Sequence, residues 1–138
     1  MMTAEAYNKP VPKLDDPVQG PFWAAAREHR LTAQRCGTCG TLVFPGLEIC
    51  PACWERELSW VDVATEGSIW SYVVYHRAFH PGFAGELPYV VAIVENSDGV
   101  RYTGRVIGRR EDVSVGAKVR AVFADETPEF TLVKWELA

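Results

Sequence analysis

Apolar and polar residues alternate with a period of two along the second half of the chain, and glycine-rich turns separate the runs. This pattern is typical of β-strands that bury one face. In one run, Val119, Ala121 and Phe123 fall on one face and charged residues on the other. Residues 96–99, Asn-Ser-Asp-Gly, have the composition of a hairpin turn. The pattern predicts five strands, over residues 68–76, 89–95, 101–107, 118–124 and 130–137.

Five antiparallel strands in so short a segment, with an irregular link over residues 108–116, match a small closed β-barrel. The oligonucleotide/oligosaccharide-binding fold, or OB-fold, has this number of strands. We therefore expect an OB-fold barrel over residues 61–138.

The first half of the chain predicts a helix and little other regular structure. Residues 1–16 lack periodicity and are expected to form an extended arm. Gly20 is the predicted N-cap of a helix that continues to Arg30. Phe22, Ala25, Ala26 and His29 would share one face of this helix. The adjacent Trp23 either packs the helix onto its own domain or docks a partner.

All four cysteines lie in two CxxC pairs, Cys36 with Cys39 and Cys50 with Cys53, and ten residues separate the pairs. Each pair places two thiolates on one tight turn, and residues 42–45 can form a hairpin that brings the turns together. Four thiolates in this spacing are typical of a structural zinc site, which leaves no coordination position open for a substrate. Short strands over residues 31–35 and 58–63 would lead into and out of the turns.

Disulfides and bound iron are the two alternatives for the cysteines. The N-terminal residues are polar and lack the apolar segment of a secretory signal. In a cytoplasmic protein, paired CxxC turns bind metal more often than they form disulfides. The sequence therefore predicts a cytoplasmic, mainly β protein, with an arm and helix over residues 1–30, a rubredoxin-like zinc ribbon over 31–60, and the barrel.

Length and charge narrow the classes of function. A chain of 138 residues suits one ordinary domain, and no apolar run is long enough to cross a membrane. The formal net charge of −4 counts against a generic nucleic-acid-binding protein, whose electrostatic surface is usually basic.

No set of residues predicts a catalytic site. The cysteines are assigned to metal, and the chain has no GxSxG turn, phosphate-binding loop or dinucleotide fingerprint. The loop over residues 76–88 joins the first two barrel strands, a position where such barrels bind ligands. It contains Arg77, Phe79 and Phe83 together with two histidines, and is either a contact surface or a solvated connector.

The third barrel strand carries a second candidate surface. Arg101, Thr103 and Arg105 alternate along it and would share one face. That face could bind nucleic acid or the phosphates of a nucleotide-bearing cofactor, or it could simply be exposed to solvent.

The order of these parts resembles a known family. The resemblance rests on the Phe22-Trp23 helix, the Cys50-Pro-Ala-Cys53 turn, the Gly67-Ser-Ile-Trp-Ser71 strand, the Pro-Tyr-Val-Val-Ala-Ile-Val-Glu run at residues 88–95 and the glycine-containing third strand. The resemblance covers the chain from Pro17 to the C-terminus. Over this range the chain is similar to the acyl-CoA-associated zinc-ribbon and OB-fold proteins known as domain of unknown function 35 (DUF35). All four cysteines match the metal ligands of that family.

The resemblance implies a non-catalytic accessory subunit. Such proteins assemble with a thiolase-like acyltransferase or aldolase, or with a MaoC-like enoyl-CoA hydratase, and help to hold the CoA thioester. From the residues themselves, we expect partner or CoA contacts at Trp23, Arg77, Phe79, Phe83, Arg101 and Arg105. Two other functions stay open: a single-stranded nucleic-acid-binding OB protein with a structural zinc ribbon, and a free-standing enzyme that uses His76 or His80 as a base.

Overall fold

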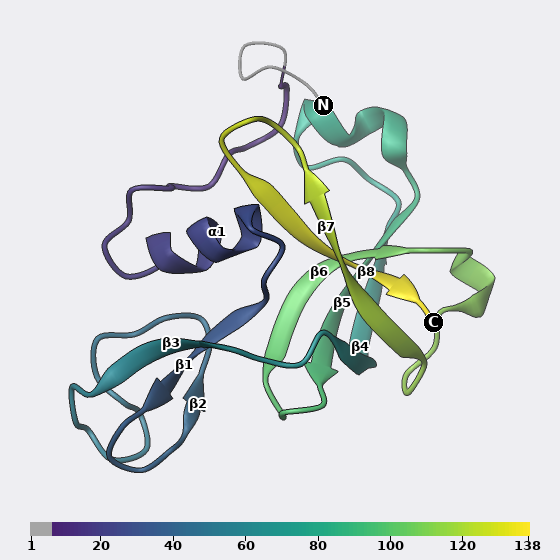
Figure 1. Ribbon diagram of the computed structural model, residues 1–138. Coiled ribbons are helices and arrows are strands. Elements are labelled where there is room, and N and C mark those ends of the chain that lie inside the picture. The colour runs from purple at the N-terminus through teal and green to yellow at the C-terminus, as the bar shows by residue number, and fades with distance from the viewer. Residues whose placement is uncertain (1–6) are drawn as a thin grey trace.

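The computed structural model describes residues 7–138, which form one helix, a three-stranded sheet and a five-stranded barrel (Figure 1). The helix is α1 (Gly20–Arg27), and the small sheet contains β1 (Thr32–Cys36), β2 (Leu42–Val43) and β3 (Leu58–Asp62). The barrel contains β4 (Glu66–Tyr75), β5 (Tyr89–Asn96), β6 (Arg101–Ile107), β7 (Lys118–Asp125) and β8 (Thr131–Leu137). Two short 3₁₀ helices, η1 (Pro81–Glu86) and η2 (Arg110–Asp112), lie in barrel connections. The predicted strands are confirmed to within two residues at each end; part of the predicted arm, residues 1–6, lies outside the described residues.

The small sheet has the order β2-β1-β3 and is antiparallel throughout. Strand β1 pairs Gln34 with Val43 on one side and with Trp60 on the other. The strand that enters the first cysteine turn therefore pairs directly with the strand that leaves the second turn. This pairing positions the two turns side by side.

The barrel closes in the order β4-β5-β6-β8-β7. The prediction that all five strands are antiparallel is wrong for one pair, because β6 and β8 run parallel, with Val106 opposite Trp135. A closed ring with an odd number of strands cannot alternate in direction all the way round. One parallel pair is therefore a geometric requirement of closure.

A single hydrophobic core joins the barrel to the ribbon. Trp135 of β8 is fully buried, and a Cβ at Gly104 of β6 would lie 3.1 Å from its indole, so a larger residue there would force its neighbours to shift. The cluster continues through Tyr102 to Phe22 of α1. The Tyr102 hydroxyl donates a hydrogen bond to the carbonyl oxygen of Thr32 in β1, at 2.8 Å.

Helix α1 begins and ends differently from the prediction. The Asp16 carboxylate accepts the backbone N–H groups of Val18 and Gln19, both at 2.8 Å, and Gln19, not Gly20, is the N-cap. The helix ends at Arg27, and His29 adopts a left-handed φ of 59°. The N–H of Arg30 then bonds to the carbonyl of Ala25 at 3.0 Å, as in a Schellman motif.

His29 therefore does not share the buried face of α1, and its predicted place there is wrong. The residue is exposed, and its imidazole stacks on Phe123 with ring centroids 5.3 Å apart. Its Nε2 lies 3.0 Å from the Asp125 carboxylate. Hydrogen bonds from Thr131 and then His29 lower the pKa of Asp125. The end of the helix is thus fastened to the barrel.

Candidate functional site

The four cysteines meet at the tip of the small sheet. Their Sγ atoms all lie within 4.8 Å of one another, with Cys36 3.5 Å from Cys53 and Cys39 3.7 Å from Cys50. Four thiolates around zinc at about 2.3 Å would be separated by about 3.8 Å, so the arrangement fits a tetrahedral ion. None of the four is in a disulfide in this structure, and their arrangement favours bound metal over the disulfide alternative.

The two cysteine turns repeat the same backbone geometry. The N–H of Cys36 bonds to the carbonyl of Thr41 and that of Cys50 to the carbonyl of Glu55, both at 2.9 Å. The residue after each pair, Gly40 or Trp54, returns a 2.8 Å bond to the carbonyl of the first cysteine. Pro51 in the second turn does not disturb this pattern.

The thiols have unequal proton affinities. The hydroxyl and backbone N–H of Thr41 lower the pKa of Cys39 to about 6. A backbone N–H from Glu55 acts to lower the pKa of Cys53, but burial and the neighbouring thiols outweigh it and raise that pKa to about 12. Cys39 therefore loses its proton more readily than Cys53. A divalent cation bound to the four sulfurs would displace the remaining thiol protons.

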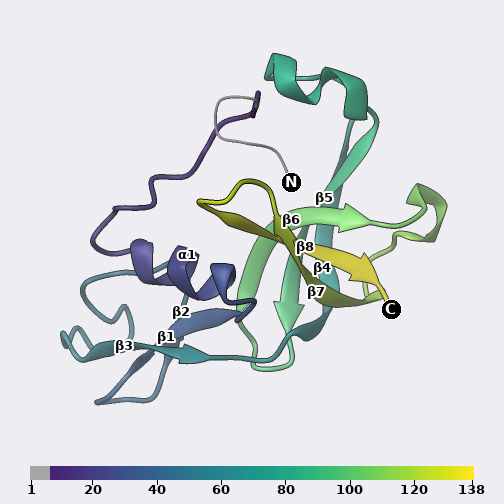
Figure 2. The same ribbon diagram turned by 45° about the horizontal axis from the view of Figure 1, so that its top comes forward.

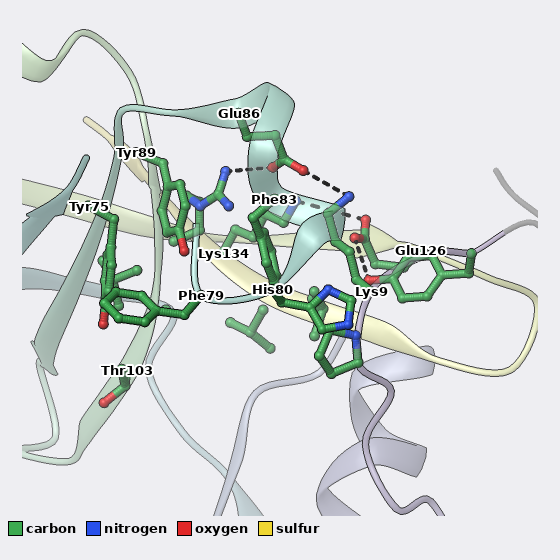
Figure 3. Close-up of a pocket in the computed structure, with 17 residues that line it drawn as sticks. Lys9, Tyr75, Phe79, His80, Phe83, Glu86, Tyr89, Thr103, Glu126 and Lys134 are labelled. Carbon is green, nitrogen blue, oxygen red and sulfur yellow. Dashed lines mark hydrogen bonds and ion pairs between the residues drawn. The ribbon is translucent and has the colours of Figure 1, made fainter. Parts of the chain in front are cut away.

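A second feature is a cavity of about 800 Å³ on the outer face of the barrel (Figure 3). Its walls come from the N-terminal arm, the β4–β5 connection with η1, the end of β4, strands β5, β6 and β8, and the β7–β8 connection. The lining residues are Tyr7, Lys9, Pro10, Tyr75, Phe79, His80, Phe83, Glu86, Tyr89, Val91, Thr103, Gly104, Arg105, Glu126, Leu132, Val133 and Lys134.

Glu86 of η1 holds two cations on one side of the cavity. One carboxylate oxygen lies 2.8 Å from Lys9 Nζ, and the other lies 3.0 Å from a guanidinium nitrogen of Arg105. Figure 3 shows both contacts as dashed lines that leave the Glu86 carboxylate. Burial would raise the pKa of Glu86, but hydrogen bonds from Lys9 and Arg105 outweigh it and lower the pKa. This bridge joins the arm, η1 and β6.

Aromatic rings next to this bridge form another part of the wall. Tyr75 stacks on Tyr89 at 5.0 Å between centroids, and Phe83 lies 5.7 Å from Tyr89. Phe79 meets the edge of Tyr75 at 5.9 Å and is 75% exposed. The Arg105 guanidinium covers Tyr89 at 4.1 Å from its centroid, so the wall combines flat apolar surface with a cation.

The arm also contacts the β7–β8 connection. The Tyr7 hydroxyl donates to Glu126 at 3.2 Å, and Lys134 Nζ lies 3.8 Å from the same carboxylate. Burial and Glu126 raise the pKa of Tyr7 to about 12, so the phenol stays protonated. A Cβ at Gly82 of η1 would collide with the Asn8 carbonyl, which explains why glycine occupies that position.

The structure brings three of the predicted contact residues together. Phe79, Phe83 and Arg105 line the cavity, and Arg77 lies over the Phe79 ring at 5.6 Å. Arg101 lies outside the lining, over Trp70 at 4.0 Å and 3.1 Å from the Glu95 carboxylate. Because Arg101 and Arg105 each face a carboxylate, their strand does not present the free cationic platform that nucleic-acid binding would use.

Trp23 and His80 have structural contacts, whereas His76 is exposed. Trp23 is half-buried and packs edge-on against Phe22 at 5.2 Å and against Phe130 at 6.5 Å. The Nδ1 atom of His80 accepts the backbone N–H of Gly82 at 3.0 Å and caps η1. Sequence reasoning missed the arm residues Tyr7 and Lys9, because nothing local indicates that an aperiodic segment forms one wall of a cavity.

Among residues 7–138, no helix is long and apolar enough to cross a membrane.

Two family models match adjacent parts of the chain. The ChsH2 rubredoxin-like zinc ribbon domain matches residues 23–59, and the ChsH2 C-terminal OB-fold domain matches residues 60–124. A chain of the solved Ltp2–ChsH2(DUF35) aldolase superposes with a TM-score of 0.82 at 32% identity, over 91% of this chain and 98% of the other. The match therefore includes both the ribbon and the barrel.

Named relatives come from several organisms. A DUF35 domain-containing scaffold protein of Methanocaldococcus jannaschii is 38% identical over 73% of each chain. A probable enoyl-CoA hydratase alpha subunit of Thermomonospora curvata is 39% identical over 80% of this chain, and the match spans about a third (35%) of its own length. The benzoylsuccinyl-CoA thiolase subunit BbsA of Thauera aromatica is 29% identical over 62% of this chain and 57% of its own.

Proposed function

The chain belongs to the DUF35 family of zinc-ribbon and OB-fold proteins, and from this we propose that it is a non-catalytic accessory subunit of an acyl-CoA-processing enzyme complex. Its partner is a thiolase-like acyltransferase or aldolase, or a MaoC-like hydratase. Its role is to support the active site of that enzyme and to help hold the CoA thioester. A four-thiolate metal site stays reduced most readily in the cytoplasm, which is the compartment we propose.

The similarity to a chain of the Ltp2–ChsH2(DUF35) aldolase carries this proposal. It covers 98% of that chain, so the whole ribbon-and-barrel body is shared and not only one module. Relatives named as a hydratase alpha subunit and as a thiolase subunit support the same class of partner.

The cavity supplies chemistry suited to a thioester ligand or to the surface that surrounds it. Tyr75, Phe83 and Tyr89 offer flat apolar surface for a ring or an acyl chain. Three cations and two carboxylates line it, which leaves an excess of positive charge toward a phosphate-bearing ligand. Phe79 is exposed and can be covered by a partner without any change in the barrel.

The cysteine centre is proposed to bind one zinc ion per chain in a structural role. With four thiolates as ligands, the ion has no open position for water or substrate, and it fastens the two turns of the ribbon. The ribbon is thus held in one shape against α1 and the barrel. Chemistry on the thioester is left to the partner.

The test is a titration of this chain into its catalytic partner, identified first by co-purification from the native host. We expect that the chain alone turns over no acyl-CoA and that turnover by the partner rises as the chain is added. Phe79→Ala removes an exposed anchor and should weaken assembly or raise the apparent KM by up to about thirtyfold, equivalent to about 2 kcal/mol. Phe83→Ala should act in the same direction.

Val115→Ala is the matched control, because Val115 is 67% exposed and lies outside the cavity lining. It should titrate like the wild type. Full activity of the partner without this chain would contradict the accessory role. Equal titrations for the control, Phe79→Ala and Phe83→Ala would exclude the cavity from that role.

A further inference from the structure

The two cysteine turns differ at one equivalent position. Gly40 follows the first CxxC pair with a φ of 79°, and Trp54 follows the second with a φ of 69°. Each donates its N–H to the first cysteine of its turn, at 2.8 Å in both cases. The chain therefore contains an internal reference: one copy of this turn uses glycine, and the other places tryptophan in the same backbone conformation.

Neither the backbone nor the core of the protein explains this tryptophan. A left-handed φ raises the conformational energy of a residue that has a Cβ, whereas glycine adopts it without this steric penalty. The Trp54 side chain is 80% exposed, so it recovers little free energy through burial. A strained backbone that presents an exposed indole points to a role outside the chain.

A second exposed apolar side chain lies in the loop before the second cysteine turn. Leu47 is 43% exposed, yet its backbone N–H and carbonyl are both held by the amide of the buried Gln34, at 2.7 and 3.0 Å. The preceding Gly46 is held in the same two-bond manner by Gln19. Glu48 and Arg56, 4.0 Å apart, link the loop of Leu47 to the segment that follows Trp54.

The charges around these two side chains have one predominant sign. Residues 47–57 carry the exposed acids Glu48, Glu55 and Glu57 against one arginine. A second copy of the chain would present the same negative rim and be repelled, whereas a surface rich in lysine and arginine would be attracted. Tryptophan within such a rim is the composition of a binding hot spot.

We propose that Trp54 and Leu47 are the anchors of a protein-docking surface at the ribbon tip, which inserts into an apolar pocket rimmed by basic residues on the acyl-CoA enzyme subunit. The inference rests on the proposed function, because it takes that enzyme as the occupant. It adds a contact remote from the cavity: the ribbon and η1 lie at opposite ends of the molecule (Figure 2). The zinc ribbon would then be a docking element as well as a structural one.

Trp54→Gly tests the proposal because it introduces glycine, the residue that the first cysteine turn has at the equivalent position. The variant should bind metal as the wild type does. Its thermal unfolding temperature should be at least as high, since glycine suits a positive φ. Its affinity for the identified, recombinantly produced enzyme subunit should fall by at least tenfold in a calorimetric or interferometric titration. Trp70→Ala, which removes a 48% exposed indole from the barrel, is the control and should keep the affinity within threefold.

A charge test separates the rim from the anchor. Glu55→Lys with Glu57→Lys should slow association and reverse its dependence on salt, while dissociation stays nearly constant. Wild-type binding together with undiminished binding by Trp54→Gly would overturn this proposal and leave the accessory role standing. Absence of wild-type binding would overturn both. Loss of self-association in Trp54→Gly, measured by sedimentation, would instead assign the surface to a second copy of the chain and also overturn the proposal.

Discussion

Replacing Glu86 by glutamine tests whether the bridge between the arm and the barrel stabilises the cavity. Glu86→Gln keeps the size of the side chain but removes the charge that Lys9 and Arg105 share, at 2.8 and 3.0 Å. The amide of glutamine also turns one acceptor into a donor, which must face one of the two cations. Both cations are mostly buried, so neither recovers full hydration when its partner is lost.

The expected loss lies between two limits. Hydrogen bonds to charged groups contribute about 1.5–3 kcal/mol each in dry surroundings, and exposed ion pairs about 0–1 kcal/mol. Because the Glu86 side chain is 33% exposed, we expect the two interactions together to contribute about 1–2 kcal/mol to the free energy of unfolding at pH 7. Amides of residues 7–9 should also exchange hydrogen faster, because the arm loses its contact with η1.

The stabilisation that Glu86 provides should depend on pH, and its direction follows from the shift in pKa. The pKa of Glu86 is lowered in the folded protein, so its ionised form stabilises the fold at every pH above the unfolded value. That stabilisation is lost as pH falls through the lowered folded pKa. Urea unfolding of wild type and Glu86→Gln should therefore differ fully at pH 7 and much less at pH 3.

Glu111→Gln is the control for this measurement. Glu111 lies 3.6 Å from Arg109 in a pair with both side chains largely exposed, so its loss should change stability by less than about 0.5 kcal/mol. An effect of Glu86→Gln no larger than that of Glu111→Gln at pH 7 would refute the reasoning. So would a larger effect that stays the same from pH 7 to pH 3.

Two further predictions concern the metal centre and the contact between ribbon and barrel. Purified, reduced protein should contain about one zinc per chain, as measured by metal analysis. Cys36→Ser or removal of zinc with a chelator should unfold the ribbon, as measured by circular dichroism. Metal-free protein with an intact ribbon would contradict this prediction. Tyr102→Phe removes the hydroxyl that bonds to the Thr32 carbonyl in a buried setting, and should lower the free energy of unfolding by about 1–2 kcal/mol in urea titration, with the native fold retained. Stability equal to that of the wild type would show that this bond contributes nothing to holding β1 against the barrel.

The barrel could be predicted because its strands follow local rules. Alternation along β7 and β8 and the turn at residues 96–99 each depend on neighbours within a few positions. The parallel pairing of β6 with β8 depends instead on closure of the whole ring, which no local pattern contains. The predicted end of α1 was wrong for a similar reason. His29 takes a left-handed φ that non-glycine residues adopt infrequently, and its contacts with Phe123 and Asp125 involve residues far away in the sequence.

The clustering of the four cysteines was predictable from the sequence, and the cavity only in part. Two CxxC pairs identify the four ligands through spacing alone. The β4–β5 loop could be named as a contact surface because of its length and aromatic residues. The cavity residues of the N-terminal arm and the β7–β8 connection could not, since Lys9 and Glu126 reach the cavity from segments far apart in sequence.

Strand β8 enters the ring between β6 and β7 although it is the last strand of the chain. A chain that stopped at the Thr127–Pro128 bend would keep four strands but lose Trp135, the largest fully buried side chain. Both flanking strands would then expose rows of unpaired backbone N–H and C=O groups, which readily pair with other molecules. A product truncated before β8 would therefore be prone to aggregate, and the barrel can close only after β8 has been synthesised.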